Sequence, residues 1–381
     1  MFFKMNTYEV EAVGVKKGLL SIVATVSSIL ILLGCGPRPA IGPQGTNSKE
    51  SGGFIDVHNH LLGHYGSPSR IQGTDFEGAA RVALDAMKRL GIEKMFIMPP
   101  PFSPDHPGRY TFEDLIGTVK KYPDRFAFLG GGGTLNVMIQ ESVRLDTTTQ
   151  RLKSQFEKKA MDILSKGAIG FGELTSEHFS FSTDHPYESA PPDHPLFLLL
   201  SDIAAHQGVP IDIHMEAVPQ DMPLPRVRRL ESPYNPKMLR ANIAAFERLL
   251  AYNRSTKIIW SHVGWCNTGH RTPALCADLL EKHPNLYMSF KIRPDSMPET
   301  MPLTQDFRIK DEWLNLIRAH PERFLIGSDH FYATPSGHMQ KGPGRMVGEE
   351  TKRLLTLLPP ELARKVAFEN AVRIFKLMNK N

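Results

Sequence analysis

The chain has 381 residues, of which 41% are hydrophobic and 22% are charged. This composition supplies enough apolar side chains for a sizeable core and excludes a disordered chain. The formal net charge is +5, and lysine and arginine form no dense run in the sequence apart from residues 226–229. Because nucleic-acid-binding proteins gather their basic residues on one surface, we expect no nucleic-acid partner.

The N-terminal segment has the pattern of an export signal. Two lysines precede an almost wholly apolar run over residues 18–33, and a basic start with an apolar stretch of this length is typical of a secretory signal peptide. The run ends in Leu-Leu-Gly-Cys35, which resembles the lipobox of bacterial lipoproteins. We therefore expect a signal peptide over residues 1–34, a lipid anchor on Cys35, and a place on the periplasmic or extracellular face of the cell envelope. An uncleaved anchor helix is the alternative.

The next segment differs in composition from the rest. Residues 35–52 are rich in Gly, Pro, Ser and Asn, which is typical of a flexible tether. We expect the folded domain to cover residues 53–381. We expect Cys266 and Cys276, which fall across a predicted strand end and a predicted helix, to be separate thiols.

From residue 54 onward, short apolar runs rich in β-formers alternate with segments of helical periodicity. Eight strands alternating with helices favour a (β/α)8 TIM barrel over an open doubly wound sheet. A final helix over residues 360–378 is expected to pack outside the barrel. The predicted strands are residues 54–58, 94–98, 126–129, 168–174, 210–215, 257–263, 286–292 and 324–328. The clearest predicted helices are residues 76–90, 150–164, 196–206, 237–252, 273–283 and 345–357.

The segments that follow the strands are longer than those that follow the helices, and they are rich in Pro, Gly and charged residues. In a TIM barrel, loops in this position build the active site at the carboxyl ends of the strands. These long segments are residues 99–111, 175–195, 216–235, 293–311 and 330–344.

The first predicted strand ends in two histidines, His58 and His60. Residues i and i+2 of a strand point to the same side, so both imidazoles can reach one point in space while Ile55, Val57 and Asn59 face the other way. A strand can hold a metal in this manner. An isolated His-x-His is equally compatible with a strand end that happens to be rich in histidine, so the other strands must decide.

Polar side chains recur at the ends of five predicted strands, which a barrel would bring into one ring. A lone histidine at such a place is often only hydrogen-bonded structure, and a lone aspartate is often a helix cap. Together, however, they supply the imidazole nitrogens and carboxylate oxygens that bind zinc and similar divalent ions. The set is His58 and His60, Glu173, His214, His262, and Asp329.

This combination of ligands suits hydrolytic chemistry. A catalytic metal site keeps a position open for water and lowers the pKa of that water from about 16 to about 7. A neighbouring carboxylate can accept the water's proton and pass it to a leaving group. An imidazole can hydrogen-bond the oxyanion that develops.

The same residues carry a family resemblance, which extends from residue 54 to about residue 378. They resemble the amidohydrolase superfamily, and specifically its amidohydrolase-2 (amidohydrolase-related) branch. Residues 368–375 are similar to the closing helix of that branch. The motifs are Asp56-Val-His58-Asn-His60, Ile213-His214, Ser261-His262-Val-Gly264 and Gly327-Ser-Asp329-His330.

The resemblance implies a role for each matched residue. His58, His60, His214 and Asp329 would be metal ligands, and Asp329 would also be the catalytic proton acceptor. His262 would be catalytic by polarising or orienting the substrate. Because these ligand types suit several divalent ions, we expect Zn²⁺ and keep Mn²⁺ and Fe²⁺ as alternatives.

Glu173 departs from the family pattern. Many two-metal members have a carbamylated lysine at this place, at the end of the fourth strand. A glutamate there resembles the TatD-type deoxyribonucleases, in which it bridges two metals, although the surroundings of Asp329 and His262 are less similar to that group. We expect one metal, with a two-metal site that includes Glu173 as the alternative. Glu173 could also orient a ligand histidine.

Basic and aromatic side chains near the predicted rim suggest an anionic substrate. Lys291 and Arg293 share one face at the end of the seventh predicted strand, and arginine pairs with carboxylate or phosphate through two parallel hydrogen bonds. Arg70, which follows the first strand, and Trp265, which follows His262, are further candidates for substrate binding. The alternative is that the cations are solvated or pair with nearby acids.

The sequence therefore predicts a metal-dependent hydrolase that uses a metal-activated water on an ester, lactone or amide bond of a small anionic substrate. A decarboxylase of an aromatic or enoic acid is the alternative, because the same branch contains lyases with a very similar metal site. A further alternative, a two-metal phosphodiesterase or nuclease of TatD type, is supported by Glu173 alone. No residue directly favours a binding protein that has lost its chemistry.

Overall fold

The computed structural model describes residues 52–67, 70–182, 185, 187–335 and 347–377. The predicted signal peptide, Cys35 and nearly all of the predicted tether lie outside these residues. Glu50–Asn381 form one compact unit. Within the described ranges, no helix combines the length and the apolar character that crossing a membrane requires.

The central sheet is built from parallel strands that pair with their neighbours in chain order. The last strand returns to the first through the pair Asp56 and Ile326. The strands are β1 (Phe54–Leu62), β4 (Ile92–Ile97), β5 (Phe126–Phe128), β6 (Gly130–Gly131), β7 (Phe171–His178), β9 (Pro210–Met215), β12 (Lys257–Val263), β13 (Leu286–Phe290) and β14 (Phe324–Ile326).

The sheet closes into a barrel at Leu129. β5 pairs with β4, β6 pairs with β7, and Leu129 alone separates β5 from β6. The Leu129 amide donates to the carbonyl of Ile97 at 3.1 Å, and the next amide, that of Gly130, donates to the carbonyl of Gly170 at 3.3 Å. One continuous segment therefore serves as the third strand and joins the two edges of the sheet, which confirms the predicted TIM barrel.

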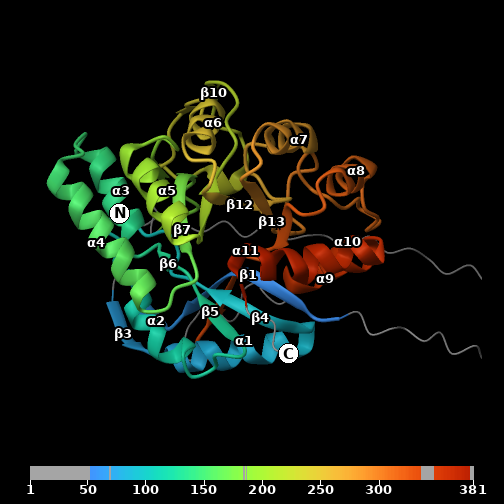
Figure 1. Cartoon of the computed structure of the whole chain (residues 1–381), viewed down its shortest axis with the longest axis horizontal. Helices are drawn as coiled ribbons and strands as arrows, with labels where there is room; N and C mark the ends of the chain where they lie inside the picture. Colours follow the sequence, from blue (N-terminus) through green and yellow to red (C-terminus); the bar gives the residue numbers. More distant parts are fainter. Residues whose placement is uncertain (1–51, 68–69, 183–184, 186, 336–346, 378–381) are drawn as a thin grey trace, which may run out of the picture. The chain divides into compact units, whose positions relative to one another are not determined.

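Helices cover the outer face of the barrel (Figure 1), and apolar side chains such as Phe171, Trp260 and Phe290 fill the layer between strands and helices. α1 begins at the N-cap Asp75, whose carboxylate accepts the Gly78 amide, and ends at Gly91, which has a left-handed φ of 79°. The helices are α1 (Phe76–Leu90), α2 (Phe112–Val119), α3 (Leu135–Arg144), α4 (Gln150–Ser165), α5 (Pro195–Gln207), α6 (Ile243–Tyr252), α7 (Pro273–Lys282), α8 (Asp311–Ala319) and α9 (Val347–Leu357).

The start of α6 differs from the prediction. A helix was expected from residue 237, but Met238–Leu239 form a short strand, β11, that pairs with β10 (Met222–Pro223). The chain becomes helical only at Ile243, after Asn242 has donated its side-chain amide to the carbonyl of Glu216. The loop that precedes α6 is therefore tied back to the end of β9.

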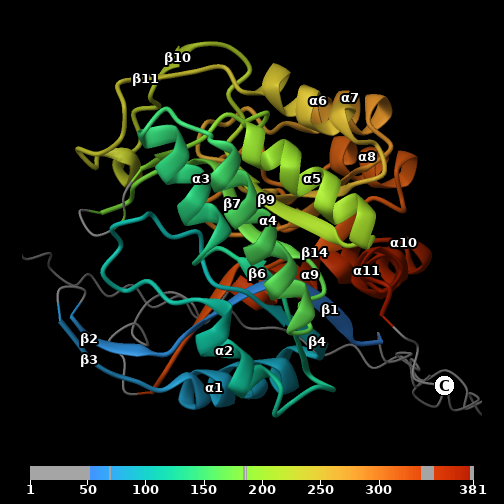
Figure 2. The same cartoon turned by 60° about the vertical axis from the view of Figure 1, so that its left-hand side comes forward.

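The C-terminal segment closes the amino-terminal end of the barrel. It comprises α10 (Pro360–Arg364), the π-helical turn η4 (Lys365–Glu369) and α11 (Asn370–Phe375), and Figure 2 shows it opposite the β2–β3 and β10–β11 hairpins. Phe375 packs into the apolar interior at the amino-terminal end of the barrel, which we call the lower interior. Its ring centroid lies 4.7 Å from that of Phe96. The final helix therefore lies across the end of the barrel and forms its floor, whereas the sequence analysis expected it only to pack on the outside.

β1 contains an irregularity that the alternation rule did not anticipate. Its register with β4 shifts between Asp56 and Asn59. Ile55 and Val57 pack with Leu129 and other side chains of the lower interior, and His58 also points into the barrel, where it meets Glu173. The prediction that Ile55 and Val57 face away from the histidines is therefore wrong, because a bulge resets the alternation.

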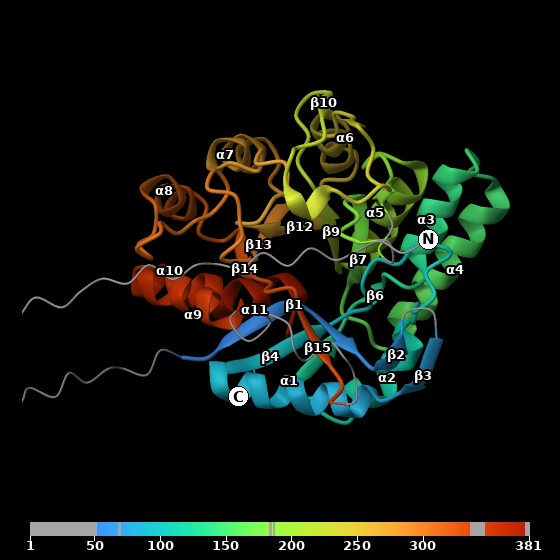
Figure 3. The same ribbon diagram turned by 180° about the vertical axis from the view of Figure 1, so that it is seen from behind.

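Short strands add walls above the carboxyl end of the barrel. β2 (His64–Ser67) and β3 (Arg70–Thr74) form an antiparallel hairpin directly after β1. β15 (His330–Ala333) pairs with the end of β1 (Figure 3), and β8 (Glu188–Ser189) pairs with the end of β7. β8 and β15 lie in two of the long segments that were predicted to build the active-site face, whereas the β2–β3 hairpin lies in residues 64–74, which were not among them.

Candidate active site

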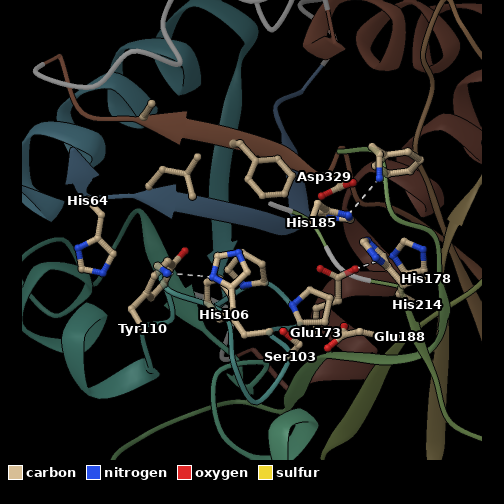
Figure 4. A pocket seen from close by; sticks show the side chains of 18 of the residues that line it. His64, Ser103, His106, Tyr110, Glu173, His178, His185, Glu188, His214 and Asp329 are labelled. Carbon is tan, nitrogen blue, oxygen red and sulfur yellow. Dashed lines mark hydrogen bonds and ion pairs between the residues drawn. The ribbon is translucent and has the colours of Figure 1, made fainter. Parts of the chain in front are cut away.

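The barrel brings the six strand-end residues of the prediction into one buried cluster. β1 supplies His58 and His60, β7 supplies Glu173, β9 supplies His214 and β12 supplies His262, while Asp329 follows β14. Each is at most 8% exposed. Figure 4 shows Glu173, His214 and Asp329 at one end of a pocket.

Glu173 lies at the centre of the cluster, and its two carboxylate oxygens face different histidines. Oε2 is 3.3 Å from Nε2 of both His58 and His60. Oε1 is 2.9 Å from Nδ1 of His214 and 3.1 Å from Nε2 of His262. One carboxylate therefore connects all four imidazoles.

Asp329 joins this cluster to a cation. Its Oδ1 is 3.1 Å from Nε2 of His60, and its Oδ2 accepts a hydrogen bond from the Lys291 ammonium. Asp329 and His262 both adopt positive φ, at 52° and 67°. Non-glycine residues in this region cost about 1–3 kcal/mol each and tend to occur at functional sites.

The two β1 histidines are oriented from behind. Nδ1 of His58 lies 3.1 Å from Oδ1 of Asp212, and Nδ1 of His60 donates to the carbonyl of Met98 at 2.9 Å. Asp212 is held in turn by the Ser261 hydroxyl at 2.5 Å. Such outer contacts direct the other ring nitrogen, Nε2, toward a metal. Asp212 was not among the predicted site residues, although an acidic residue between Ile211 and Ile213 of a buried strand was a visible signal.

The charged groups of the cluster favour the binding of a positively charged ion. Burial alone would raise the pKa of Glu173, but His58, His214 and His262 bring it well below its ordinary value. Burial likewise opposes ionisation of Asp329, and Lys291 and His262 bring its pKa well below the ordinary value. Burial lowers the pKa of His58, but Asp212 and Glu173 raise it well above the ordinary value. Two buried carboxylates are therefore ionised at neutral pH.

The donor atoms fit a divalent metal ion. One group of close donor atoms comes from His58, His60, Glu173 and Asp329, and a second comes from Glu173, His214 and His262. Nε2 of His58 and Nδ1 of His262 are buried and have no hydrogen-bond partner among the described residues. His214, predicted as a ligand with the β1 histidines, belongs to the second group. Glu173 is common to both.

The cluster opens into a cavity of about 890 Å³. Three of the four predicted substrate-binding residues line it, namely Lys291, Arg293 and Trp265. The Lys291 ammonium lies 3.7 Å from the Trp265 ring centroid, which is a favourable cation–π distance. Arg70 begins β3, but its side chain lies outside the described part of the structure.

Lys291 and Arg293 both pair with acidic side chains, which was the alternative expected from the sequence. Lys291 pairs with Asp329, and Arg293 Nε lies 2.9 Å from Asp295 Oδ1. Both cations nevertheless line the cavity. Pairing with nearby acids, one of the two alternatives that the sequence left open, is therefore present in the structure.

Several cavity residues were not predicted. Arg229, from the 3₁₀ turn η1 (Arg228–Leu230), donates to Asn267 Oδ1 at 2.5 Å and to the carbonyl of Asp295 at 2.7 Å. His178 lies at the end of β7, four residues beyond the predicted strand end, and its ring centroid is 4.5 Å from that of His214. Glu188 of β8 also lines the cavity. Burial raises the pKa of Glu188 to about 8.

The cysteines take no part in the described site. Cys266 and Cys276 are free and buried, as expected from the sequence. Burial raises the pKa of Cys276 to about 12, so its thiol is protonated and unreactive at neutral pH. Cys35 lies outside the described residues.

Comparisons with known proteins agree with the fold and the site. A family model described as amidohydrolase matches residues 167–377, more than half of the chain, so this protein belongs to the amidohydrolase family (amidohydrolase-2 branch). A search of curated protein sequences gave no match.

Solved structures of this fold were also found. A probable 2-pyrone-4,6-dicarboxylic acid hydrolase from Acinetobacter baumannii, solved with citric acid bound, has a TM-score of 0.50 and 12% identity, with 85% of this chain and 99% of that chain covered. A 2,6-dihydroxybenzoate decarboxylase from Rhizobium has a TM-score of 0.45 and 13% identity, and a 5-carboxyvanillate decarboxylase from Sphingomonas paucimobilis has 0.45 and 14%. Both of these alignments cover 86% of this chain and 99% of the other chain.

The family is one of metal-dependent enzymes that act on small molecules. The buried cluster of histidines and carboxylates is this chain's candidate for the metal-binding site. The resemblance inferred from the motifs is therefore confirmed at the level of the family.

Proposed function

We propose that this protein is a metal-dependent hydrolase that directs water onto an ester, lactone or amide bond of a small anionic substrate. The observation that carries the proposal is the position of Asp329, a buried, ionised carboxylate that touches the histidine cluster and also lines the cavity. A carboxylate in this position is ready to accept a proton from water.

His58, His60, Glu173 and Asp329 would hold the metal, with His214 and His262 beside Glu173. A divalent ion held by such ligands lowers the pKa of a bound water and polarises a carbonyl group. Zn²⁺ is our first choice, with Mn²⁺ or Fe²⁺ as alternatives, because imidazole and carboxylate suit all three.

The chain's own residues would move the proton and bind the substrate. Asp329 accepts the proton, and the Lys291 ammonium beside it stabilises the carboxylate until the proton arrives. Burial, together with Lys291 and His214, brings the pKa of His262 well below its ordinary value. A neutral His262 can hydrogen-bond a substrate oxygen without placing another positive charge beside Lys291.

The position of Glu173 bears on whether the site holds one metal ion or two. Its two oxygens face separate pairs of histidines, which supports a bridging role between two ions as well as the single-ion form that the sequence favoured. Because of this observation, a two-metal phosphodiesterase of TatD type remains an alternative function. One metal per chain, with no hydrolysis of bis(4-nitrophenyl) phosphate, would remove it.

A decarboxylase is the second candidate, and the lining of the cavity supports it. Trp265 lies against the Lys291 ammonium and Phe331 lies against the His60 ring, so an aromatic acid could stack against a ring while its carboxylate meets a cation. Product analysis separates the two reactions, because a decarboxylase releases carbon dioxide whereas a hydrolase consumes water.

The test combines metal analysis of the chain from Gly52 onward with a hydrolysis screen of esters, lactones and amides. We expect stoichiometric zinc or manganese and turnover of at least one anionic substrate. Asp329→Asn should lower kcat by about 10²–10⁴-fold, whereas Asp202→Asn, at an exposed site on α5, should not. Full turnover by Asp329→Asn would contradict the proposed proton transfer.

We also propose that the chain is anchored to the bacterial cell envelope through Cys35. The support is the apolar run that ends in Leu-Leu-Gly-Cys35. Radiolabelled palmitate should label the wild type and not Cys35→Ser, and the variant should leave the membrane fraction. Equal labelling of both proteins would refute the anchor.

A further inference from the structure

We propose that the substrate is an amphiphile whose polar, anionic group lies at the metal cluster and whose long apolar arm lies in a gallery beside it. This inference rests on the proposed function, because it names the substrate class of the same site. The apolar gallery is defined by Leu62, Tyr65, Ile71, Phe102, Tyr110 and Phe331.

The cavity is much longer than the reacting group requires. It runs from Glu173 and Asp329 at one end to His64 and Tyr110 at the other, and Figure 4 shows these pairs at opposite sides of the pocket. Its volume is about 890 Å³, near the upper end of the range of about 300–1,000 Å³ that accommodates drug-sized ligands. An acid with a single ring would fill only the part near the cluster.

The far end of the gallery is lined mainly by rings, those of Phe102 and Tyr110 together with the imidazoles of His64 and His106. The Tyr110 hydroxyl donates to the carbonyl of Leu61 at 2.7 Å, so only the ring of Tyr110 faces the cavity. The Tyr110 ring centroid lies 5.1 Å from those of both Phe76 and Phe102. This wall is rigid and mainly apolar, and it suits hydrocarbon better than a second charged group.

Two further apolar side chains of the gallery come from additions to the barrel. The Phe331 ring packs on His60, with the ring centroids 4.4 Å apart, where the gallery meets the cluster. Ile71 lies on the β2–β3 hairpin and Phe331 lies on β15. Both line the cavity, yet they are 40% and 41% exposed. Apolar side chains gathered at a cavity in this way mark a binding surface. A bound apolar arm would remove both from water.

The cations gather at the other end, which gives the ligand its direction. Lys291 stacks on Trp265, and the Arg229 guanidinium lies 5.9 Å from the same ring. Arg229 is held in place by Asn267 and by the carbonyl of Asp295. The cavity therefore has charged side chains of both signs at the cluster, where a bound metal ion would add positive charge, and mainly apolar side chains in the gallery. This two-ended pattern suits an amphiphilic anion.

Straight-chain alkanoates test the gallery without any need for turnover. Binding of butyrate, hexanoate, octanoate and decanoate to the metal-loaded chain would be measured by isothermal titration calorimetry. Burial of each methylene should tighten Kd about fourfold, until the gallery is full. A Kd that does not change with chain length would overturn the proposal.

Two matched variants locate the effect. Ile71→Asn should weaken decanoate binding several-fold and leave butyrate binding unchanged, because only the longer ligand reaches the hairpin. Leu145→Asn, at an apolar residue that is 59% exposed and does not line the cavity, should change neither. Equal losses in the two variants would mean that the alkanoates bind to the surface and not in the gallery.

The outcomes distinguish the gallery from the chemistry. If the chain-length dependence is found and no ester, lactone or amide is hydrolysed, the gallery stands and the hydrolase proposal fails. If short anionic substrates are hydrolysed and alkanoate binding ignores chain length, the hydrolase stands and the gallery fails.

Discussion

Asp212 shows how far the cluster depends on side chains behind it. Its carboxylate lies 3.1 Å from Nδ1 of His58 and receives the Ser261 hydroxyl at 2.5 Å, and it is fully buried. It does not line the cavity, so its contribution is to fix the tautomer and orientation of His58.

Asp212→Asn should therefore weaken metal binding by about 10–100-fold, the usual cost of losing such a contact. Metal content after dialysis against a graded chelator series measures the effect. Asp202→Asn is the matched control. The Asp202 carboxylate lies at an exposed site, where it accepts hydrogen bonds from Tyr252 and Asn253. Unchanged metal retention in Asp212→Asn would show that His58 does not need this partner.

Glu177 provides a pH-dependent contribution to stability outside the metal cluster. Burial raises its pKa from 4.5 to about 7, although the Tyr187 and Ser189 hydroxyls donate to it. Because the folded pKa is the higher one, the unfolded chain loses this proton first as pH rises. The associated stability is present below pH 4.5 and is lost as pH rises to about 7, and the loss amounts to roughly 3 kcal/mol.

Glu177→Gln removes this titration. The free energy of unfolding of the variant, relative to wild type, should rise by roughly 3 kcal/mol between pH 4.5 and pH 7.5, as measured by urea unfolding at each pH. Glu141→Gln, at a side chain that is 49% exposed, should follow the wild type. A constant difference across the pH range would mean that Glu177 is already ionised in the fold.

At the scale of elements, Arg271 joins two strands that carry site histidines. Its guanidinium is buried and donates to the carbonyls of Met215 on β9 and Ser261 on β12. These residues adjoin His214 and His262 in the chain. The side chain also stacks on Trp260, at 4.3 Å from the ring centroid. Arg271 therefore fixes the spacing of the two strand ends.

Arg271→Lys should lower the free energy of unfolding by about 2–3 kcal/mol, because one ammonium cannot donate to both carbonyls in the geometry of the guanidinium fork. The relative position of β9 and β12 should also loosen, and metal affinity should fall with it. Arg248→Lys, whose parent side chain is 62% exposed and pairs with Asp193, serves as the control. Denaturant unfolding and metal titration would both be measured, and wild-type values in both would refute this role.

The elements that the sequence predicted well are those with a strong local pattern. α1 has a capping aspartate, an apolar stripe and a terminal glycine, and its predicted bounds are those of the structure. α2, α3 and α8 are 8, 10 and 9 residues long, and none was among the clearest predicted helices. The strands of the barrel were all anticipated, because each is a compact apolar run.

The site residues at strand ends could be predicted from the sequence. The features that depend on three-dimensional contacts could not. His58, His60, Glu173, His214, His262 and Asp329 follow apolar runs, so the barrel brings them together. The division of their donor atoms into two groups follows from side-chain directions that spacing does not contain. His178 was missed because β7 continues four residues past Leu174 and bends into the cavity wall.

At the scale of the whole molecule, metal binding and folding should be coupled, because the donor atoms come from β1, β7, β9, β12 and the segment after β14, which are far apart in the chain. Binding to the folded state alone stabilises it by about 2.7 kcal/mol when free metal is at 100 times Kd. Removal of the metal with a chelator should lower the melting temperature by about 4 °C or more, and added ZnCl₂ should restore it.

Differential scanning fluorimetry of the native, stripped and reloaded chains measures this coupling. Asp329→Asn removes a carboxylate from the first donor group, so its melting temperature should respond less to the chelator. A stripped chain, verified by metal analysis, that melts at the wild-type temperature would show that the metal site and the fold are independent.

The C-terminal floor of the barrel imposes an order on how the molecule is made. His58 and His60 are synthesised early, but β1 gains its partner Ile326 only when the eighth strand appears, and Phe375 completes the interior later still. A nascent chain therefore cannot complete the ring around His58 and His60 until β14 and α11 have been synthesised. A truncation before α10 would retain every proposed ligand and lose the packing of Phe375 against Phe96.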